Sequence, residues 1–300
     1  GHGERKLDGL ANHDLGDFGK KLGQNGFQLS SLNLALAQDV PGNGNVLIIT
    51  QPQIRLLPGE VDKILRYVDN GGNLLWLLDA EPLHGLERLA SRLGLLLTPG
   101  TITDPDAQQI GAPDNWTLGA SYPPHPVTRN FSLITAFPHA RALGREDSSG
   151  QADSERKNAS GLWQRSTLVE EASNGWVSRD TAVPKKPRFD KNRDLHGPFS
   201  VAIALQRSVK EREQRIVVVG SGSFLANAYA GNGGNLDLGI NMVNWLAQEE
   251  HLITTQPRAT VDNSITLSKN QLSAISIGFV IVLPLLLAIV GGVLWWRRRT

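Results

Sequence analysis

The feature that most constrains this chain is a long apolar run near its C-terminal end. From Asn270 to Trp296 there are 27 consecutive uncharged residues, and positions 275–296 read ISIGFVIVLPLLLAIVGGVLWW. A helix of 22 residues reaches about 33 Å, enough to cross a hydrocarbon core of about 30 Å. A buried core helix would have a shorter apolar run and a less basic end. The segment Ile275–Trp296 therefore predicts a transmembrane helix that binds the lipid bilayer.

The flanks of this segment predict its orientation. Trp295 and Trp296 lie where an interfacial aromatic belt is expected, and three arginines follow at 297–299. Basic residues next to a membrane helix stay on the cytoplasmic side. We therefore expect 297–300 to be a cytoplasmic tail and everything before Ile275 to be extracytoplasmic, which in a bacterium means the periplasmic side of the inner membrane.

Composition narrows the classes of function. Of the 300 residues, 40% are hydrophobic and 20% are charged, as in globular proteins that bury a core. Lys+Arg number 30 and Asp+Glu 29, a net charge of +1. This balance argues against nucleic-acid binding, which normally shows a basic excess. The chain has no cysteine, which excludes disulfides, thiolate metal sites and a cysteine nucleophile.

Strand-like and helix-like segments alternate ahead of the membrane segment. Continuous apolar runs, typical of buried strands, occur at 46–49, 74–78, 201–205 and 216–219, and a further strand is expected around 27–34. Apolar residues at helical spacing occur within 15–22, 61–68, 86–93 and 238–246. Continuous apolar strands separated by amphipathic helices are typical of a parallel sheet covered on both faces. The sequence therefore predicts a doubly wound α/β domain.

The domain organisation follows from the places where the alternation of strand-like and helix-like segments ends. We expect an extracytoplasmic α/β domain over 1–258, with a polar insertion or subdomain at 144–198, and a polar linker at 259–274. Within the insertion, Gly144–Ser160 is typical of an exposed loop, and Leu168–Val169 and Trp176–Val177 are candidate strand fragments. The opening residues Gly1–Glu4 have the character of a loop between a strand and a helix, so we expect a first strand before them.

Several motifs, taken in order, resemble one known family. They are GHGE at 1–4, LLPGE at 56–60, GGNLLWLLD at 71–79, HPVTRNF at 125–131, FPHARAL at 137–143, VVVGSGSFLANAYAGNGGNLDLGINMVNWLA at 217–247, and the membrane segment with its WWRRR ending. The chain resembles the gliding-motility auxiliary components of ABC transport systems, the GldG-like proteins. The resemblance implies a periplasmic domain with a class I glutamine-amidotransferase-like, flavodoxin-like fold, anchored in the inner membrane. It also implies ABC permease and ATPase subunits as partners.

In an open parallel sheet, ligands bind beyond the carboxyl ends of the strands. The loops expected at that edge supply the candidate residues for a polar ligand: His2, Gly3, Glu4, Gln51, Asp79, Glu81, Gly220, Ser221, Gly222, Ser223 and Asn227. The turn at 220–223 offers backbone N–H groups to an anion, although paired glycines more often serve tight geometry. The family commonly carries acidic residues where this chain has Ser221 and Ser223, which removes any role that needs a carboxylate there.

Catalysis finds little support in the sequence. The amidotransferase-like relatives use a cysteine, so Ser221 or Ser223 would have to be the nucleophile, with His2 or His125 as base and Glu4 as acid. No spacing places these residues together. The seven histidines lack metal-site spacing, and there is no P-loop. We therefore expect no catalytic residue, metal or cofactor, and an ATPase supplied by a partner.

The sequence as a whole favours a membrane-anchored, non-enzymatic auxiliary subunit of an ABC-type transport system that binds a polar ligand or a partner. Two alternatives stay open at this point. One is a cell-envelope hydrolase with a serine nucleophile, and the other is a structural scaffold of the envelope.

Overall fold

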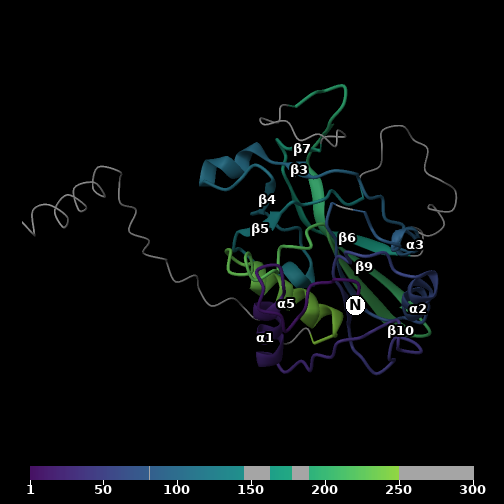
Figure 1. Ribbon diagram of the computed structural model, residues 1–300. Coiled ribbons are helices and arrows are strands. Elements are labelled where there is room, and N and C mark those ends of the chain that lie inside the picture. The colour runs from purple at the N-terminus through teal and green to yellow at the C-terminus, as the bar shows by residue number, and fades with distance from the viewer. Residues whose placement is uncertain (81, 145–162, 178–188, 250–300) are drawn as a thin grey trace, which may run out of the picture. The chain divides into compact units, whose positions relative to one another are not determined.

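The computed structural model describes residues 1–80, 82–144, 163–177 and 189–249 (Figure 1). The chain divides into two compact units, Gly1–Gln256 and Pro257–Thr300. The predicted linker, the membrane segment Ile275–Trp296 and the tail lie outside the described residues, as does the predicted loop after Gly144. Within the described ranges, no helix is both long enough and apolar enough to span a membrane.

Helices and strands alternate in the first part of the first unit, and strands predominate in its last part. Its first part contains α1 (Gly16–Gln24), β1 (Leu47–Ile49), α2 (Pro58–Asp69), β2 (Leu74–Leu77) and α3 (Glu87–Arg92). Its middle part contains β3 (Ile102–Thr103), the 3-10 helix η1 (Pro105–Ile110), β4 (Trp116–Gly119), the 3-10 helix η2 (Pro126–Thr128) and β5 (Thr135–Pro138). Its last part contains β6 (Gln164–Glu171), β7 (Trp176–Val177), β8 (Leu195–His196), β9 (Phe199–Val209), β10 (Arg212–Val219) and α5 (Asn235–Leu246). The four helices expected from apolar spacing and the four strands expected from continuous apolar runs are confirmed.

The main sheet is mixed rather than wholly parallel. Its strand order is β1-β2-β10-β9-β6. The first three strands are parallel neighbours, whereas β9 runs antiparallel to both β10 and β6. The prediction of a parallel sheet is therefore wrong for β9. The reason is the two-residue turn Lys210-Glu211, whose φ angles of 49° and 65° fold β9 and β10 into a hairpin.

Helices cover both faces of this sheet, as the sequence predicts. Leu75 and Leu77 of β2 pack in one core cluster with residues of α1 and α5. The alternate residues Leu74 and Trp76 pack in a second cluster with residues of α2 and α3. Figure 1 shows α1 and α5 on one side of the strands and α2 and α3 on the other. The assignment to a flavodoxin-like, amidotransferase-like fold stays a prediction.

Two further expectations need correction. The strand expected around 27–34 does not form, because this segment makes no ladder pairing and its Leu29 side chain is 42% exposed. The fragment Leu168–Val169 is confirmed as a strand, but as part of β6 it joins the edge of the main sheet instead of forming a subdomain. Trp176–Val177 is confirmed as β7, which pairs with β3 and β8 in a separate small sheet.

Candidate functional site at the strand ends

The loops that follow β1, β2 and β10 meet at the carboxyl edge of the sheet. The backbone N–H of Asp79, just after β2, donates to Gln51 Oε1 over 3.2 Å. The N–H of Gly222, after β10, donates to Asp79 Oδ1 over 2.9 Å. The opening loop joins them, because His2 O accepts from the N–H of Gln53 over 2.8 Å. The predicted convergence of these loops is confirmed.

Asp79 is the centre of this edge. Its carboxylate accepts from Gly222 through Oδ1 and from the Arg5 guanidinium through Oδ2, the latter over 3.0 Å. A Cβ added at Gly222 would lie 2.7 Å from Asp79 Oδ1, so only glycine lets the backbone approach the carboxylate this closely. Gly222 therefore shapes the 220–223 turn around a carboxylate of the protein itself.

Arg5 is the residue that sequence reasoning missed. Its Nη2 donates to Asp79 and also to Ser223 Oγ, each over 3.0 Å. Its backbone N–H donates to Thr50 Oγ1 over 2.9 Å. The side chains of Arg5 and Asp79 are only 12% and 15% exposed. Arg5 therefore lies across the ends of β1, β2 and β10 and closes the edge. The signal available in the sequence was a cation directly after GHGE.

His2 fastens the opening loop to α2. It adopts a left-handed backbone conformation with φ of 58°, and its Nε2 lies 3.1 Å from Glu60 Oε2. The same Glu60 oxygen accepts from the N–H of Leu57 over 2.8 Å and so caps the first turn of α2. Glu60 is buried, and its Oε1 has no hydrogen-bond partner among the described residues. The LLPGE motif thus supplies a buried carboxylate that the candidate set omitted.

Glu4 contacts the loop after β1. Its Oε1 accepts from the N–H of Thr50 over 3.2 Å. Burial raises the pKa of the Glu4 carboxyl above its ordinary value, while the Thr50 N–H acts in the opposite direction. Gly3, with φ of 74°, turns the chain between His2 and Glu4. Glu81 lies outside the described residues.

The two serines of the glycine turn are already committed to structural contacts. Ser221 is completely buried, and its hydroxyl donates to Pro138 O over 2.6 Å. Ser223 accepts from Arg5. Of the two candidate bases, His2 pairs with Glu60, while His125 Nδ1 accepts from the N–H of Val127 at the start of η2 over 3.2 Å. The geometry described here does not assemble a serine nucleophile with a base.

Asn227 makes its contacts away from the strand edge where the other candidates lie. Its Oδ1 accepts from the N–H of Asp17 over 2.9 Å, at the start of α1. Its Nδ2 donates to Gly9 O and Ala11 O over 3.0 and 2.8 Å. Asn227 therefore holds the loop before α1, and nothing in these contacts directs it to the strand edge.

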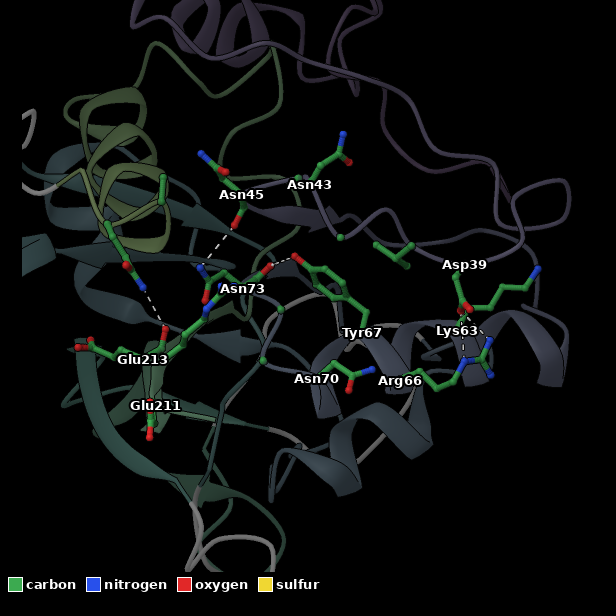
Figure 2. Close-up of a pocket in the computed structure, with 18 residues that line it drawn as sticks. Asp39, Asn43, Asn45, Lys63, Arg66, Tyr67, Asn70, Asn73, Glu211 and Glu213 are labelled. Atoms are coloured by element: carbon green, nitrogen blue, oxygen red, sulfur yellow. Dashed lines mark hydrogen bonds and ion pairs between the residues drawn. The ribbon is translucent and has the colours of Figure 1, made fainter. Parts of the chain in front are cut away.

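A pocket lies at the opposite edge of the sheet, where no candidate residue was expected. It has a volume of about 810 Å³ and is lined by residues that precede β1 and β2, the β9–β10 turn and the residues after α5 (Figure 2). Within the described part of the chain, no group of three or more histidine, aspartate or glutamate side chains is arranged to hold a metal ion.

A solved structure has a fold similar to that of this chain. The chain is similar to a structure titled "mmIFT52 N-terminal domain", with 12% sequence identity and a TM-score of 0.56. The match covers 82% of this chain and 95% of that chain. At this identity the likeness concerns the fold alone. A search of curated proteins found no match.

Comparison with protein families bears on function. Residues 1–139 match the family described as "ABC-type uncharacterized transport system". The matched range includes the opening loop, β1, β2 and Asp79, and so covers much of the strand edge described above. The match therefore shows a similarity to this family over the N-terminal part of the chain, just under half of its 300 residues.

Proposed function

We propose that this chain is a membrane-anchored auxiliary subunit of an ABC-type transport system, without enzymatic activity of its own. In this proposal its domain lies on the extracytoplasmic side of the bacterial inner membrane, and Ile275–Trp296 anchors it beside the permease. The proposal extends to a flavodoxin-like, amidotransferase-like fold and a GldG-like role in gliding motility. The observation that carries the proposal of a subunit without enzymatic activity is the closure of the strand edge by Arg5, Asp79 and Ser223.

The closed edge matters because open α/β sheets normally bind substrates there. In this chain the ends of three parallel strands are bridged by an ion pair with little exposure to solvent. A substrate would have to break that pair and leave both charges without their partners, which is costly. The edge is therefore better suited to holding the loops in a fixed shape than to exchanging a substrate.

The fixed loops present apolar side chains to a partner. Ile54 and Leu57, in the loop between β1 and α2, are 65% and 63% exposed. The N–H of Ile54 donates to His2 O over 3.1 Å, so this loop is attached to the closed edge. Exposed large apolar residues on a rigid loop are typical of protein contacts. We place the contact with the permease at these two side chains.

Co-purification of the full chain from membranes tests the proposal. We expect an ABC ATPase and its permease to be recovered with the tagged full-length protein in mild detergent. Ile54→Glu combined with Leu57→Glu should reduce that recovery at least fivefold, because two carboxylates would be buried in the contact. Leu36→Glu is the matched control, since Leu36 is 85% exposed but lies on another loop. Recovery of neither subunit by the unmodified chain would contradict the proposal.

Labelling with a serine-reactive fluorophosphonate separates this proposal from the hydrolase alternative. We expect no labelling of the folded chain, because Ser221 is buried and bound to Pro138 O and Ser223 is bound to Arg5. Labelling that disappears in Ser221→Ala or Ser223→Ala would instead establish a serine nucleophile.

A further inference from the structure

The pocket at the amino edge of the sheet is independent of the closed strand ends. It is formed by four parts of the chain: the loop 39–45, the C-terminal half of α2 with 70–73, the turn 211–213 and residues 247–248. Its volume of about 810 Å³ lies within the range of about 300–1,000 Å³ that is usual for small-molecule sites. Figure 2 shows Asp39, Lys63 and Arg66 at one end, Glu211 and Glu213 at the other, and asparagines between them.

The floor of the pocket is rigid. Asn73 Nδ2 donates to Leu246 O over 2.8 Å, and its Oδ1 accepts from the N–H of Arg215 over 2.9 Å, so one side chain joins α5, β10 and the start of β2. The hydroxyl of Tyr67 donates to Asn73 O over 2.9 Å. A Cβ on Gly72 would lie 2.3 Å from the Tyr67 ring, which shows how closely the backbone packs against that ring. A preformed floor reduces the ordering cost of binding.

The charges of the lining cancel. Three acidic residues and three basic residues line the pocket: Asp39, Glu211, Glu213, Lys63, Arg66 and Arg212. Most of them already have partners. Arg66 pairs with Asp39 over 2.7 Å, Glu213 pairs with Arg215, and Lys63 Nζ donates to two backbone carbonyls over 2.7 Å each. The pocket therefore has no excess charge to attract either an anion or a cation.

Uncommitted amides provide the hydrogen bonding. The side chains of Asn43 and Asn45 make no hydrogen bond within the described part of the chain, and both residues are exposed. Asn70 follows α2, and among the described residues the one partner of its side chain is Lys210 Nζ, 3.4 Å from Oδ1. Each amide both donates and accepts, as a hydroxyl group does. A surface that offers amides without net charge, beside an aromatic ring, matches a neutral molecule with many hydroxyl groups.

We propose that this pocket binds a neutral saccharide through Asn43, Asn45 and Asn70. The site lies apart from the strand edge and from the permease contact, so the inference goes beyond the auxiliary role and does not depend on it. Loss of saccharide binding with retained co-purification, or the reverse, tells the failure of one proposal from the failure of the other.

Two glycines make a blocking test possible. Among the described residues, a Cβ on Gly44 would meet no atom closer than 3.8 Å. Because Gly44 has no positive φ, a side chain can be added there without backbone strain. Gly44→Trp should fill the pocket and weaken binding more than tenfold. Gly59→Trp is the matched control, because Gly59 lies at the other end of α2 and a Cβ there meets no atom of the described part of the chain within 4 Å.

Isothermal titration of the full chain, in a detergent without a sugar headgroup, measures the binding. The probes are maltotriose and diacetylchitobiose, with inorganic phosphate and spermidine as charged counterparts. We expect saturable binding of a saccharide, lost in Gly44→Trp and kept in Gly59→Trp. Asn70→Ala should weaken it about fivefold, the effect of one hydrogen bond, whereas Asn12→Ala, an exposed asparagine outside the pocket, should not. Binding of neither saccharide, binding unaffected by Gly44→Trp, or saturation only by a charged probe would overturn the proposal.

Discussion

Arg5 and Asp79 form an ion pair 3.0 Å long between two parts of the chain that are 74 residues apart. Because both side chains are largely buried, removing one leaves the other without compensation. We expect Arg5→Met to lower the free energy of unfolding by about 2–4 kcal/mol. Urea unfolding followed by tryptophan fluorescence measures the change.

The control for this prediction is an exposed pair of the same kind. Arg66 and Asp39 lie 2.7 Å apart, but their side chains are 53% and 54% exposed. Arg66→Met should therefore change the free energy of unfolding by less than about 1 kcal/mol. Equal losses in the two variants would show that Arg5 does not close a buried edge.

Gly220 marks the place where β10 ends against the 137–143 segment. A Cβ there would lie 2.1 Å from Arg141 O, while the N–H of Arg141 donates to Gly220 O over 2.6 Å. Gly220→Ala must push two hydrogen-bonded backbones apart, so we expect a loss of about 3 kcal/mol in the free energy of unfolding. At Gly231 a Cβ meets no described atom within 4 Å, so Gly231→Ala should change the free energy of unfolding by less than about 0.5 kcal/mol. Thermal melts of both variants measure the loss of stability. A Gly220→Ala protein as stable as the unmodified chain would contradict the close contact between Gly220 and Arg141 O.

Asn235 holds α5 to β5 and to the loop before α5. It is fully buried, its Nδ2 donates to the carbonyls of Ala136, Phe224 and Tyr229, and its Oδ1 accepts from the N–H of Ala136. Asn235→Asp would set a carboxylate against these carbonyls and lower the free energy of unfolding by about 3 kcal/mol at neutral pH.

The Asn235→Asp variant should also become pH-dependent. Burial and the facing carbonyls raise the pKa of the new carboxyl in the folded state, so the folded state binds the proton more tightly than the unfolded state does. Stability should therefore fall as pH rises from 4 to 7. Urea titrations across this range test the slope against Asn12→Asp, where the asparagine is exposed. A flat profile would be inconsistent with the contacts of Asn235.

Asp14 and Glu4 should show opposite pH dependence. The N–H of Lys6, 3.1 Å from Asp14 Oδ1, holds the pKa of Asp14 below its ordinary value of 3.8, with a second contribution from the N–H of Ala11. Its stabilising contribution is present above that ordinary value and is lost as pH falls through the lowered pKa. Burial raises the pKa of Glu4 above 4.5, so the contribution of Glu4 is lost as pH rises through the raised value.

Substitution separates the two groups. We expect Asp14→Asn to reduce the loss of stability on acidification below about pH 4. Glu4→Gln should reduce the loss on raising the pH above 4.5, the ordinary value of that carboxyl. Chemical unfolding at a series of pH values gives both slopes. The same sign of change in the two variants would contradict these assignments.

The strand edge could be predicted because it follows from general rules. Apolar runs set the strands, and the carboxyl ends of parallel neighbours bring Gln51, Asp79 and Gly222 together whatever their side chains are. Arg5 and Glu60 could not be found in this way. The role of Arg5 depends on reaching Asp79, and that of Glu60 on being reached by His2, and sequence spacing carries no information on either contact.

The antiparallel pairing of β9 and β10 could not be predicted from the sequence for a different reason. The residues next to the hairpin turn, 206–209 and 212–215, are mostly polar and interrupt the apolar pattern of β9 and β10. The turn itself is Lys210-Glu211, which lacks the Asn-Gly or Asp-Gly usual at two positive φ angles. The pocket at the amino edge could not be predicted from the sequence either, because its lining comes from four segments that only the fold brings together.

The position of β10 in the sheet has a consequence for how the chain acquires its structure. β10 lies between β2 and β9, so among the described residues the second edge of β2 is paired by residues 216–219 alone. A fragment that ends at residue 139 would leave β2 with an unpaired edge and both apolar layers without the side chains that β9 and β10 contribute. Pairing over this sequence separation is slow to form. During synthesis, we therefore expect β1 and β2 to complete their sheet only after the β9–β10 hairpin has been made. Residues 1–139, which match the transport family, should reach their final structure only when most of the domain has left the ribosome.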